Sequence, residues 1–320
     1  MMTLQFNQSW LIYIADNRPE FATKVFQAFS FLGGMEGYLI VIALLYSVIS
    51  KRLAVLASIV ALVSMIANHL LKILIHNPRP FTVDGTYLDY WAVSPEHASE
   101  LLAEFSTPSG HAMTAAAFYG FLLFRAKGLG TRVLLLLIPL LIGLSRPVIG
   151  VHYVEDILLG WLLGGGCALL AARRVDFLWD KWQNVNVGQR AAIVVVFSIM
   201  IWTVTLLATG RQPADLPTEF VGVLGFLSGV MLAAPIEERS ISYQTHSIST
   251  TTKAIRFVLM LILLIATTEA LDAVTPLLGD LSGIMQNTWR YARYTVIGVV
   301  GVLFVPLLFV RLRLAQTGID

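Results

Sequence analysis

Apolar segments long enough to cross a membrane recur along almost the whole chain, with short polar stretches between them. A transmembrane helix needs roughly 17 to 25 mostly apolar residues. With 57% hydrophobic and 13% charged residues, the chain lies outside the usual composition of soluble domains. The sequence therefore predicts an all-α integral membrane protein, a helical bundle with about nine transmembrane helices. The expected spans are 31–50, 53–75, 110–126, 132–149, 152–172, 191–209, 219–235, 254–274 and 292–311.

The segment ahead of the first span mixes aromatic and aliphatic side chains with charged ones. This amphipathic pattern is typical of a helix that lies in the membrane interface. We therefore expect three regions along the chain. Residues 1–30 form an interfacial segment, residues 31–175 a core of five spans, and residues 190–313 an extension of four spans.

Lysine and arginine residues cluster in alternate loops between the spans, and short cytoplasmic loops carry the excess of positive charge. The loops that follow the odd-numbered spans are therefore expected to be cytoplasmic. The N-terminal segment and the opposite loops then face outward, as in a protein of a bacterial inner or plasma membrane. The basic residues that set this orientation are Lys51, Arg52, Arg125, Lys127, Arg132, Arg173, Arg174, Lys181, Arg190, Arg239, Lys253, Arg256, Arg311 and Arg313.

Several classes of ligand are disfavoured by what the sequence lacks. Net charge is only +2 and the basic residues are not pooled in one patch, which argues against a nucleic-acid partner. The sequence contains neither a glycine-rich nucleotide loop nor a histidine and glutamate metal motif. No nucleotide, metal or other cofactor is expected.

Three polar sequence blocks break the apolar pattern at ends of spans that the charge rule places at one membrane face. Ionisable residues at membrane depth are costly and usually functional. The blocks are Lys72 with Arg79-Pro80, then Pro108-Ser109-Gly110-His111, then Ser145-Arg146 with His152 and Asp156.

The first and third blocks bring together three cations, Lys72, Arg79 and Arg146. An arginine guanidinium can grip two oxygens of one phosphate, and a lysine adds a point charge. These three cations are also expected to lie on the side of the membrane opposite to the lysine and arginine clusters that set the orientation. We expect them to bind a phosphate group.

The second block has the features of a helix start. Thr107 and Pro108 are expected to be the N-cap and first helical residue of the third span. The amides of Ser109 and Gly110 would then point outward from a helix N-terminus, which is an anion site. The Ser109 hydroxyl could add a hydrogen bond to a phosphate oxygen.

His152 and Asp156 are four residues apart and should share one helix face. A carboxylate there can accept the Nδ1 proton of the imidazole and leave Nε2 unprotonated toward a substrate. A carboxylate orients the histidine of catalytic triads in the same way.

Together, the three blocks resemble the signature of the type 2 phosphatidic-acid phosphatase superfamily over about residues 31–172. The resemblance implies that His152 attacks phosphorus and forms a phosphohistidine. It implies that His111 protonates the departing oxygen, and that the substrate is a lipid phosphate. Pro147 and Glu155 are small departures from the usual pattern.

The sequence leaves the substrate open. Phosphatidic acid, phosphatidylglycerophosphate, a sphingoid-base phosphate or a polyprenyl diphosphate would all suit a site at a membrane face. A soluble sugar phosphate is the alternative substrate, and an inactive lipid-binding or transport protein is the alternative class. In the extension, Glu269 and Asp272 are expected to form structural ion pairs with Arg290 and Arg293.

Overall fold

The computed structural model describes residues 6–80, 104–212, 219–245, 249–279 and 281–318. Within these ranges the chain is helical, and its only extended pairing is an isolated bridge between Tyr243 and Thr317. The alternation of apolar and acidic residues at 95–105 also predicts a surface helix, and this segment lies mostly outside the described residues.

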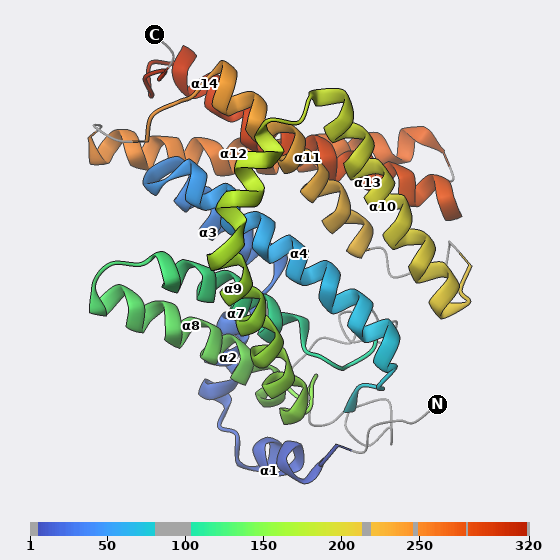
Figure 1. Ribbon diagram of the computed structural model, residues 1–320. Coiled ribbons are helices and arrows are strands. Elements are labelled where there is room, and N and C mark those ends of the chain that lie inside the picture. Colours follow the sequence, from blue (N-terminus) through green and yellow to red (C-terminus); the bar gives the residue numbers. More distant parts are fainter. Residues whose placement is uncertain (1–5, 81–103, 213–218, 246–248, 280, 319–320) are drawn as a thin grey trace. The chain divides into compact units, whose positions relative to one another are not determined.

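Helices follow one another along the chain in a simple order (Figure 1). The elements are α1 (Ser9–Asn17), α2 (Glu20–Leu32), α3 (Met35–Leu44), η1 (Leu45–Ile49), α4 (Lys51–Ile75), α7 (Gly110–Arg125), α8 (Leu129–Val148), α9 (Val154–Gln183), α10 (Val187–Thr209), α11 (Glu219–Ser240), α12 (Thr250–Val274), η4 (Thr275–Leu278), α13 (Gly283–Val299), η5 (Val300–Phe304) and α14 (Val305–Arg311).

The prediction of an all-α membrane protein is confirmed. In the described part of the chain, seven helical segments are long and apolar enough to span a bilayer, or eight if the bent pair of α2 with α3–η1 counts as one span. The remaining predicted span corresponds to α7, which has 16 residues. Each of the nine predicted segments therefore coincides with a helix, and the count of about nine spans is approximate.

The chain divides into two compact units. Unit 1 comprises Met1–Tyr38 and Val60–Val175, and unit 2 comprises Leu39–Ile59 and Asp176–Asp320. Both units are therefore built from separate stretches of sequence, and α4 and α9 each contribute to both.

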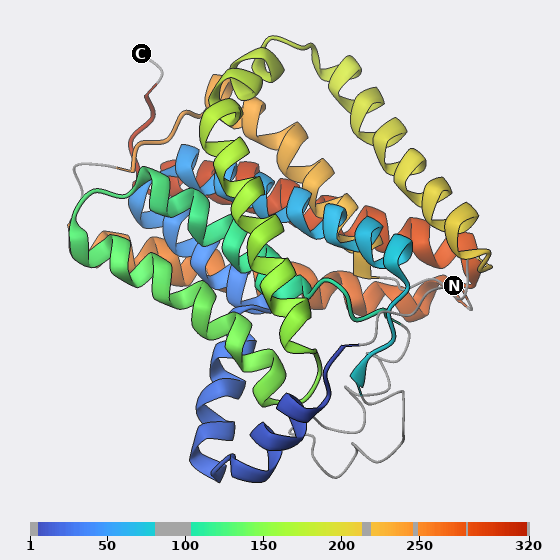
Figure 2. The same ribbon diagram turned by 60° about the horizontal axis from the view of Figure 1, so that its bottom comes forward.

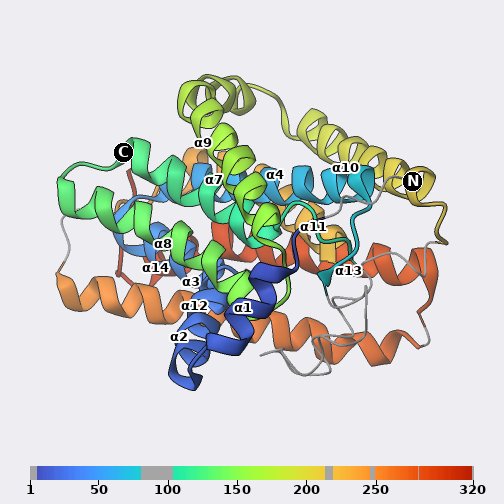
Figure 3. The same ribbon diagram turned by 90° about the horizontal axis from the view of Figure 1, so that it is seen from below.

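In unit 1, α8 packs against α7 on one side and against α1 and α2 on the other. Figure 2 shows α7 and α8 running side by side, and Figure 3 shows α1 and α2 lying near the end of α8. Pro147 disfavours helical geometry at the preceding Arg146 and so predicts an end of the fourth span there. The helix instead continues through Pro147 to Val148.

Small residues let α9 approach α7 closely. A Cβ atom added at Gly160 would lie 3.0 Å from Ala112 Cβ, and one added at Gly164 would lie 2.2 Å from the Met113 carbonyl oxygen. Helices in membranes pack by such small residues, spaced four apart, because the backbones can then come close together. This contact lies close to the first turns of α7 and α9, which carry His111 and Asp156.

Unit 2 is organised around α11, which packs against α13 and α10. Gly225 and Gly229 of α11 face the backbone of α13, at Tyr291 and Thr295. Asp272 pairs with Arg293, which confirms one of the ion pairs expected in the extension.

Candidate active site

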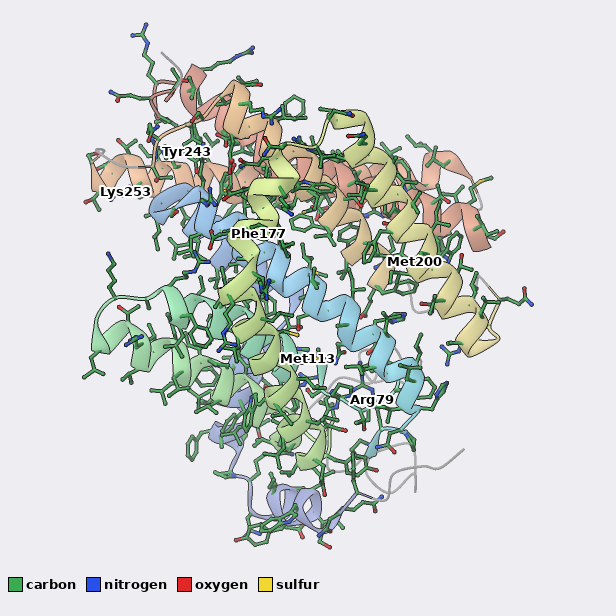
Figure 4. All side chains as sticks on the ribbon, viewed as in Figure 1. Arg79, Met113, Phe177, Met200, Tyr243 and Lys253 are labelled. Carbon is green, nitrogen blue, oxygen red and sulfur yellow. The ribbon has the colours of Figure 1, made fainter. Side chains whose placement is uncertain are left out.

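The residues of the three blocks come from the ends of helices in unit 1. Lys72 lies in the last turn of α4, and Arg79 follows the end of that helix (Figure 4). His111 lies in the first turn of α7, and Arg146 in the last turn of α8. His152 precedes α9 and Asp156 lies in its first turn.

Asp156 is completely buried and accepts hydrogen bonds on both carboxylate oxygens. The Thr107 hydroxyl donates to Oδ1 at 2.5 Å, and the Ser106 hydroxyl donates to Oδ2. The backbone N–H of Tyr153 also donates to Oδ2, at 3.0 Å. These bonds compensate for the cost of burying a charge, and they tie the segment before α7 to the start of α9.

The two ring nitrogens of His152 have different surroundings. Nδ1 lies 3.1 Å from Asp156 Oδ2 and 3.2 Å from the Ser106 hydroxyl oxygen. Nε2 lies 3.3 Å from Nη1 of Arg79. With the carboxylate on Nδ1, the unprotonated nitrogen is the one beside the cation.

Charge and burial favour the neutral form of His152. Only 2% of the residue is exposed. Burial lowers the pKa of His152 well below its ordinary value of 6.5, and the charges of Arg79 and Arg146 act in the same direction. The imidazole is therefore neutral near pH 7, as a nucleophile must be.

A carboxylate bridges two of the three cations. Glu104 Oε2 lies 2.5 Å from Lys72 Nζ and 3.1 Å from Arg79 Nη2. Arg79 also donates to two backbone carbonyls, from Nε to Glu104 at 3.3 Å and from Nη1 to Val151 at 3.3 Å. The sequence blocks therefore meet in space, and Glu104 is an addition that they did not include.

His111 and Arg146 meet the end of α2. The Arg146 Nη1 group donates to the Ser30 hydroxyl, while its buried Nε has no partner among the described residues. A Cβ atom at Gly33 would lie 2.9 Å from Cδ2 of His111, so glycine lets α2 approach the imidazole closely. His111 also experiences the charges of Arg146, Lys72 and Arg79, which places it in the same electrostatic site.

Two expectations for the start of α7 are wrong in detail. The N-cap is Ser109 and not Thr107, because the Ser109 hydroxyl accepts from Ala112 and the helix begins at Gly110. The hydroxyl of Thr107 is bonded to Asp156 instead. The Ser109 amide donates to the backbone oxygen of Asp156 at 3.1 Å, so this amide is used within the protein and does not point outward.

Four residues of the site were not identified from the sequence. Ser106 and Glu104 lie just before the second block, Ser30 lies on α2, and Asn68 lies on α4. The Asn68 side-chain N–H donates to the Pro108 carbonyl at 3.0 Å and so supports the loop before α7. The only sequence signal for Ser106 and Glu104 is that they lie close to Pro108 in the chain. The sequence around Ser30 and Asn68 contains no signal of a role in the site.

In the part of the chain that the structure describes, no group of three or more histidine, cysteine, aspartate or glutamate side chains could hold a metal ion. The chemistry that the described residues offer is therefore that of one imidazole held by a carboxylate, a second imidazole and three cations. This combination suits nucleophilic transfer of a phosphoryl group.

Two known family descriptions match parts of the chain. Residues 52–180 match the family described as the PAP2 superfamily. Residues 221–317 match the PAP2 superfamily phosphatase, transmembrane extension. The chain belongs to the PAP2 superfamily of membrane phosphatases and carries both its domain and its transmembrane extension.

Two solved structures are similar to part of the chain. One is the transmembrane PAP2 type phosphatidylglycerolphosphate phosphatase from Bacillus subtilis, at 25% identity and a TM-score of 0.42, over 51% of this chain and 81% of that one. The other is LpxE from Aquifex aeolicus, at 21% identity and a TM-score of 0.44, over 54% of this chain and 99% of that one.

Proposed function

We propose that this membrane phosphatase hydrolyses the phosphate monoester or diphosphate of a lipid through a phosphohistidine on His152. The observation that carries the proposal is the arrangement of His152, with Nδ1 against Asp156 and Nε2 against Arg79. A phosphate bound by Arg79 lies beside the nitrogen that attacks it. Membership of the PAP2 superfamily supports the same chemistry.

In the first step, Nε2 of neutral His152 attacks phosphorus, and the bond from phosphorus to the lipid oxygen breaks. His111 must carry a proton in this step, a form that the bound phosphate dianion favours, and it gives that proton to the departing oxygen. Asp156 stabilises the positive charge that develops on the imidazole. Lys72, Arg79 and Arg146 neutralise the charge that develops on the phosphate oxygens.

In the second step, a water molecule attacks the phosphohistidine. His111, now neutral, takes a proton from the water as the bond between nitrogen and phosphorus breaks. Inorganic phosphate leaves, and both histidines return to their starting states. The residues proposed to take part are thus His111, His152 and Asp156 for catalysis, and Lys72, Arg79, Arg146, the hydroxyl of Ser109 and the amide of Gly110 for phosphate binding.

The site needs no metal ion in this scheme, because three cations provide the charge that a metal would supply. Purified protein should therefore keep its activity in a chelator such as EDTA. Complete loss of phosphate release in EDTA, with recovery on adding magnesium, would contradict the scheme.

Phosphate release from a panel of lipid and sugar phosphates, with purified protein in detergent, tests the substrate class. The proposal expects release from lipid phosphates such as phosphatidic acid, phosphatidylglycerophosphate, a sphingoid-base phosphate or a polyprenyl diphosphate. Release only from soluble sugar phosphates would favour the alternative substrate. No release from any of them would favour a lipid-binding or transport role.

Orthovanadate offers a second test of the site, because it adopts the five-coordinate geometry of phosphorus during transfer. Competitive inhibition is expected.

We further propose that the site faces the outside of a bacterial inner or plasma membrane, on the basis of the lysine and arginine distribution.

A further inference from the structure

The Glu104 carboxylate lies in contact with two cations to which the proposed function assigns the phosphate. The same oxygen, Oε2, contacts both Lys72 Nζ and Arg79 Nη2. One carboxylate oxygen thus occupies donors that a phosphate oxygen would use. The contact places a negative charge inside a site built for an anion.

The position of Glu104 relative to His152 makes this contact matter for catalysis. Arg79 presents Nη1 to His152 Nε2 and Nη2 to Glu104. An arginine binds a phosphate most strongly with two parallel N–H groups. A phosphate in line with Nε2 therefore needs the Nη2 group that Glu104 holds, and its negative charge would also repel the carboxylate.

The surroundings of Glu104 allow its side chain to move without its backbone. Arg79 Nε is bonded to the Glu104 carbonyl oxygen, and the Ser106 amide is bonded to the Asn77 carbonyl at 2.8 Å. The Glu104 side chain is 22% exposed, compared with 2% for Arg79 and 11% for Lys72. The carboxylate is therefore the most exposed member of this cluster of three charged groups.

Arg79 does not depend on this carboxylate for its position. Its bonds to the Glu104 and Val151 carbonyl oxygens remain when the carboxylate leaves. The guanidinium therefore stays beside His152 whichever anion it binds. This argues that Glu104 competes with the substrate and does not act only to hold Arg79.

We infer that Glu104 is an exchangeable internal anion of the phosphate site. It neutralises Lys72 and Arg79 while no substrate is bound, and a substrate phosphate takes its place. The consequence is a lower affinity for phosphate, including the inorganic phosphate that the reaction releases. The inference rests on the proposed phosphatase function. It adds to that function a residue that weakens the binding of the product phosphate and so favours its release.

The test measures the inhibition constant of inorganic phosphate for the full-length protein in detergent, with an aryl phosphate as substrate. It compares the wild-type protein with the variants Glu104→Gln and Glu20→Gln. Glutamine keeps the shape of the side chain and removes the charge. The inhibition constant of phosphate should fall about tenfold in Glu104→Gln, a change equivalent to about 1.4 kcal/mol. Glu20 is 83% exposed on α2, so Glu20→Gln should match wild type.

An unchanged or raised inhibition constant in Glu104→Gln would overturn the inference and make Glu104 a positioning residue. Lys72→Ala should change the constant in the opposite direction and weaken phosphate binding. If Glu104→Gln does not fold, Glu104→Asp serves instead, because its shorter side chain cannot reach both cations equally well. Its inhibition constant should lie below that of wild type, and a value above wild type would contradict the inference.

Direct titration of inorganic phosphate into His152→Ala protein, with and without Glu104→Gln, separates this inference from the proposed function. Tighter binding in the double variant supports the exchange. Equal or weaker binding in the double variant refutes the exchange while leaving the phosphatase function intact. A wild-type protein that neither binds phosphate nor releases it from any substrate refutes the function itself.

Discussion

At the scale of single residues, the proposed mechanism gives the two histidines different tasks that one pair of substitutions can separate. His152 holds its Nε2 beside Arg79, while His111 lies between Gly33 and the cations. His152→Ala should abolish both phosphate release and any phosphoenzyme, because no other described group has its geometry. His111→Ala removes the proton donor, which matters least for an aryl phosphate, whose leaving group departs without help.

In the His111→Ala variant, an aryl phosphate should therefore still transfer its phosphoryl group to His152. The phosphohistidine should then be hydrolysed slowly, because the base is missing, and it should accumulate. Mass spectrometry after rapid quenching at alkaline pH measures it. Phosphate found on His111 of the wild-type protein, or a fully active His152→Ala variant, would contradict these roles.

Ser106 is a second residue whose role can be isolated. Its hydroxyl contacts both Asp156 Oδ2 and His152 Nδ1. Ser106→Ala leaves Asp156 with its bonds to Thr107 and Tyr153, so the carboxylate remains but is held less firmly. Loss of such a supporting bond typically costs 10–100-fold at metal sites, and we expect kcat to fall by about tenfold with KM little changed.

Steady-state kinetics with an aryl phosphate check this expectation. Ser58→Ala is a suitable control, because the Ser58 hydroxyl is also buried but only bonds to the Ala54 carbonyl within its own helix. A Ser106→Ala variant with normal kcat and a raised KM would show that Ser106 acts on binding and not on the histidine.

At the scale of elements, the contact between α7 and α9 brings together the helix starts that lie next to His111 and His152. Gly164 faces the Met113 carbonyl, whereas a Cβ atom at the neighbouring Gly165 would meet nothing within 4 Å. Gly164→Ala should therefore force the helices apart and destabilise the protein by about 1–3 kcal/mol. Gly165→Ala should be neutral or stabilise the helix by about 0.5–1 kcal/mol.

Thermal unfolding of the two variants in detergent, followed by loss of helical signal and of activity, measures the difference. A lower Tm for Gly164→Ala and an unchanged or higher Tm for Gly165→Ala is expected. Equal values for both would show that the close approach of α7 and α9 does not limit stability.

The sequence predicted the helices and marked the three polar blocks because both leave local signals. Long apolar stretches mark spans, and His152 with Asp156 follows helical spacing. Contacts between distant segments leave no such signal. The bond of Arg146 to Ser30 joins residues 116 positions apart, and the sequence alone could not reveal it. The prediction of Thr107 as the N-cap is wrong for a similar reason. The Thr107 hydroxyl donates a hydrogen bond to Asp156, and the two residues meet only in the folded chain.

At the scale of the whole molecule, the positive charges of the loops predict which side of the membrane each unit 1 loop faces. Lys24 on α2 is 73% exposed, and Lys127 in the loop after α7 is also exposed. In a background where the single cysteine, Cys167, is replaced by alanine, Lys24→Cys should react with a membrane-impermeant thiol reagent in intact cells. Lys127→Cys should react only after the membrane is opened, and the reverse pattern would invert the proposed orientation.

The burial of Asp156 also bears on how the protein is made. Its carboxylate is satisfied by hydroxyls that lie 49 and 50 residues earlier in the chain, so it finds them only after α7 and α8 are in place. A chain in which only one of these two helices crossed the membrane would leave Ser106 and Asp156 on opposite sides of the bilayer. Such a chain would hold an unsatisfied charge and an unaligned His152. The proposed activity is in this way confined to molecules in which both α7 and α8 have been inserted, and a partly inserted copy has no aligned histidine.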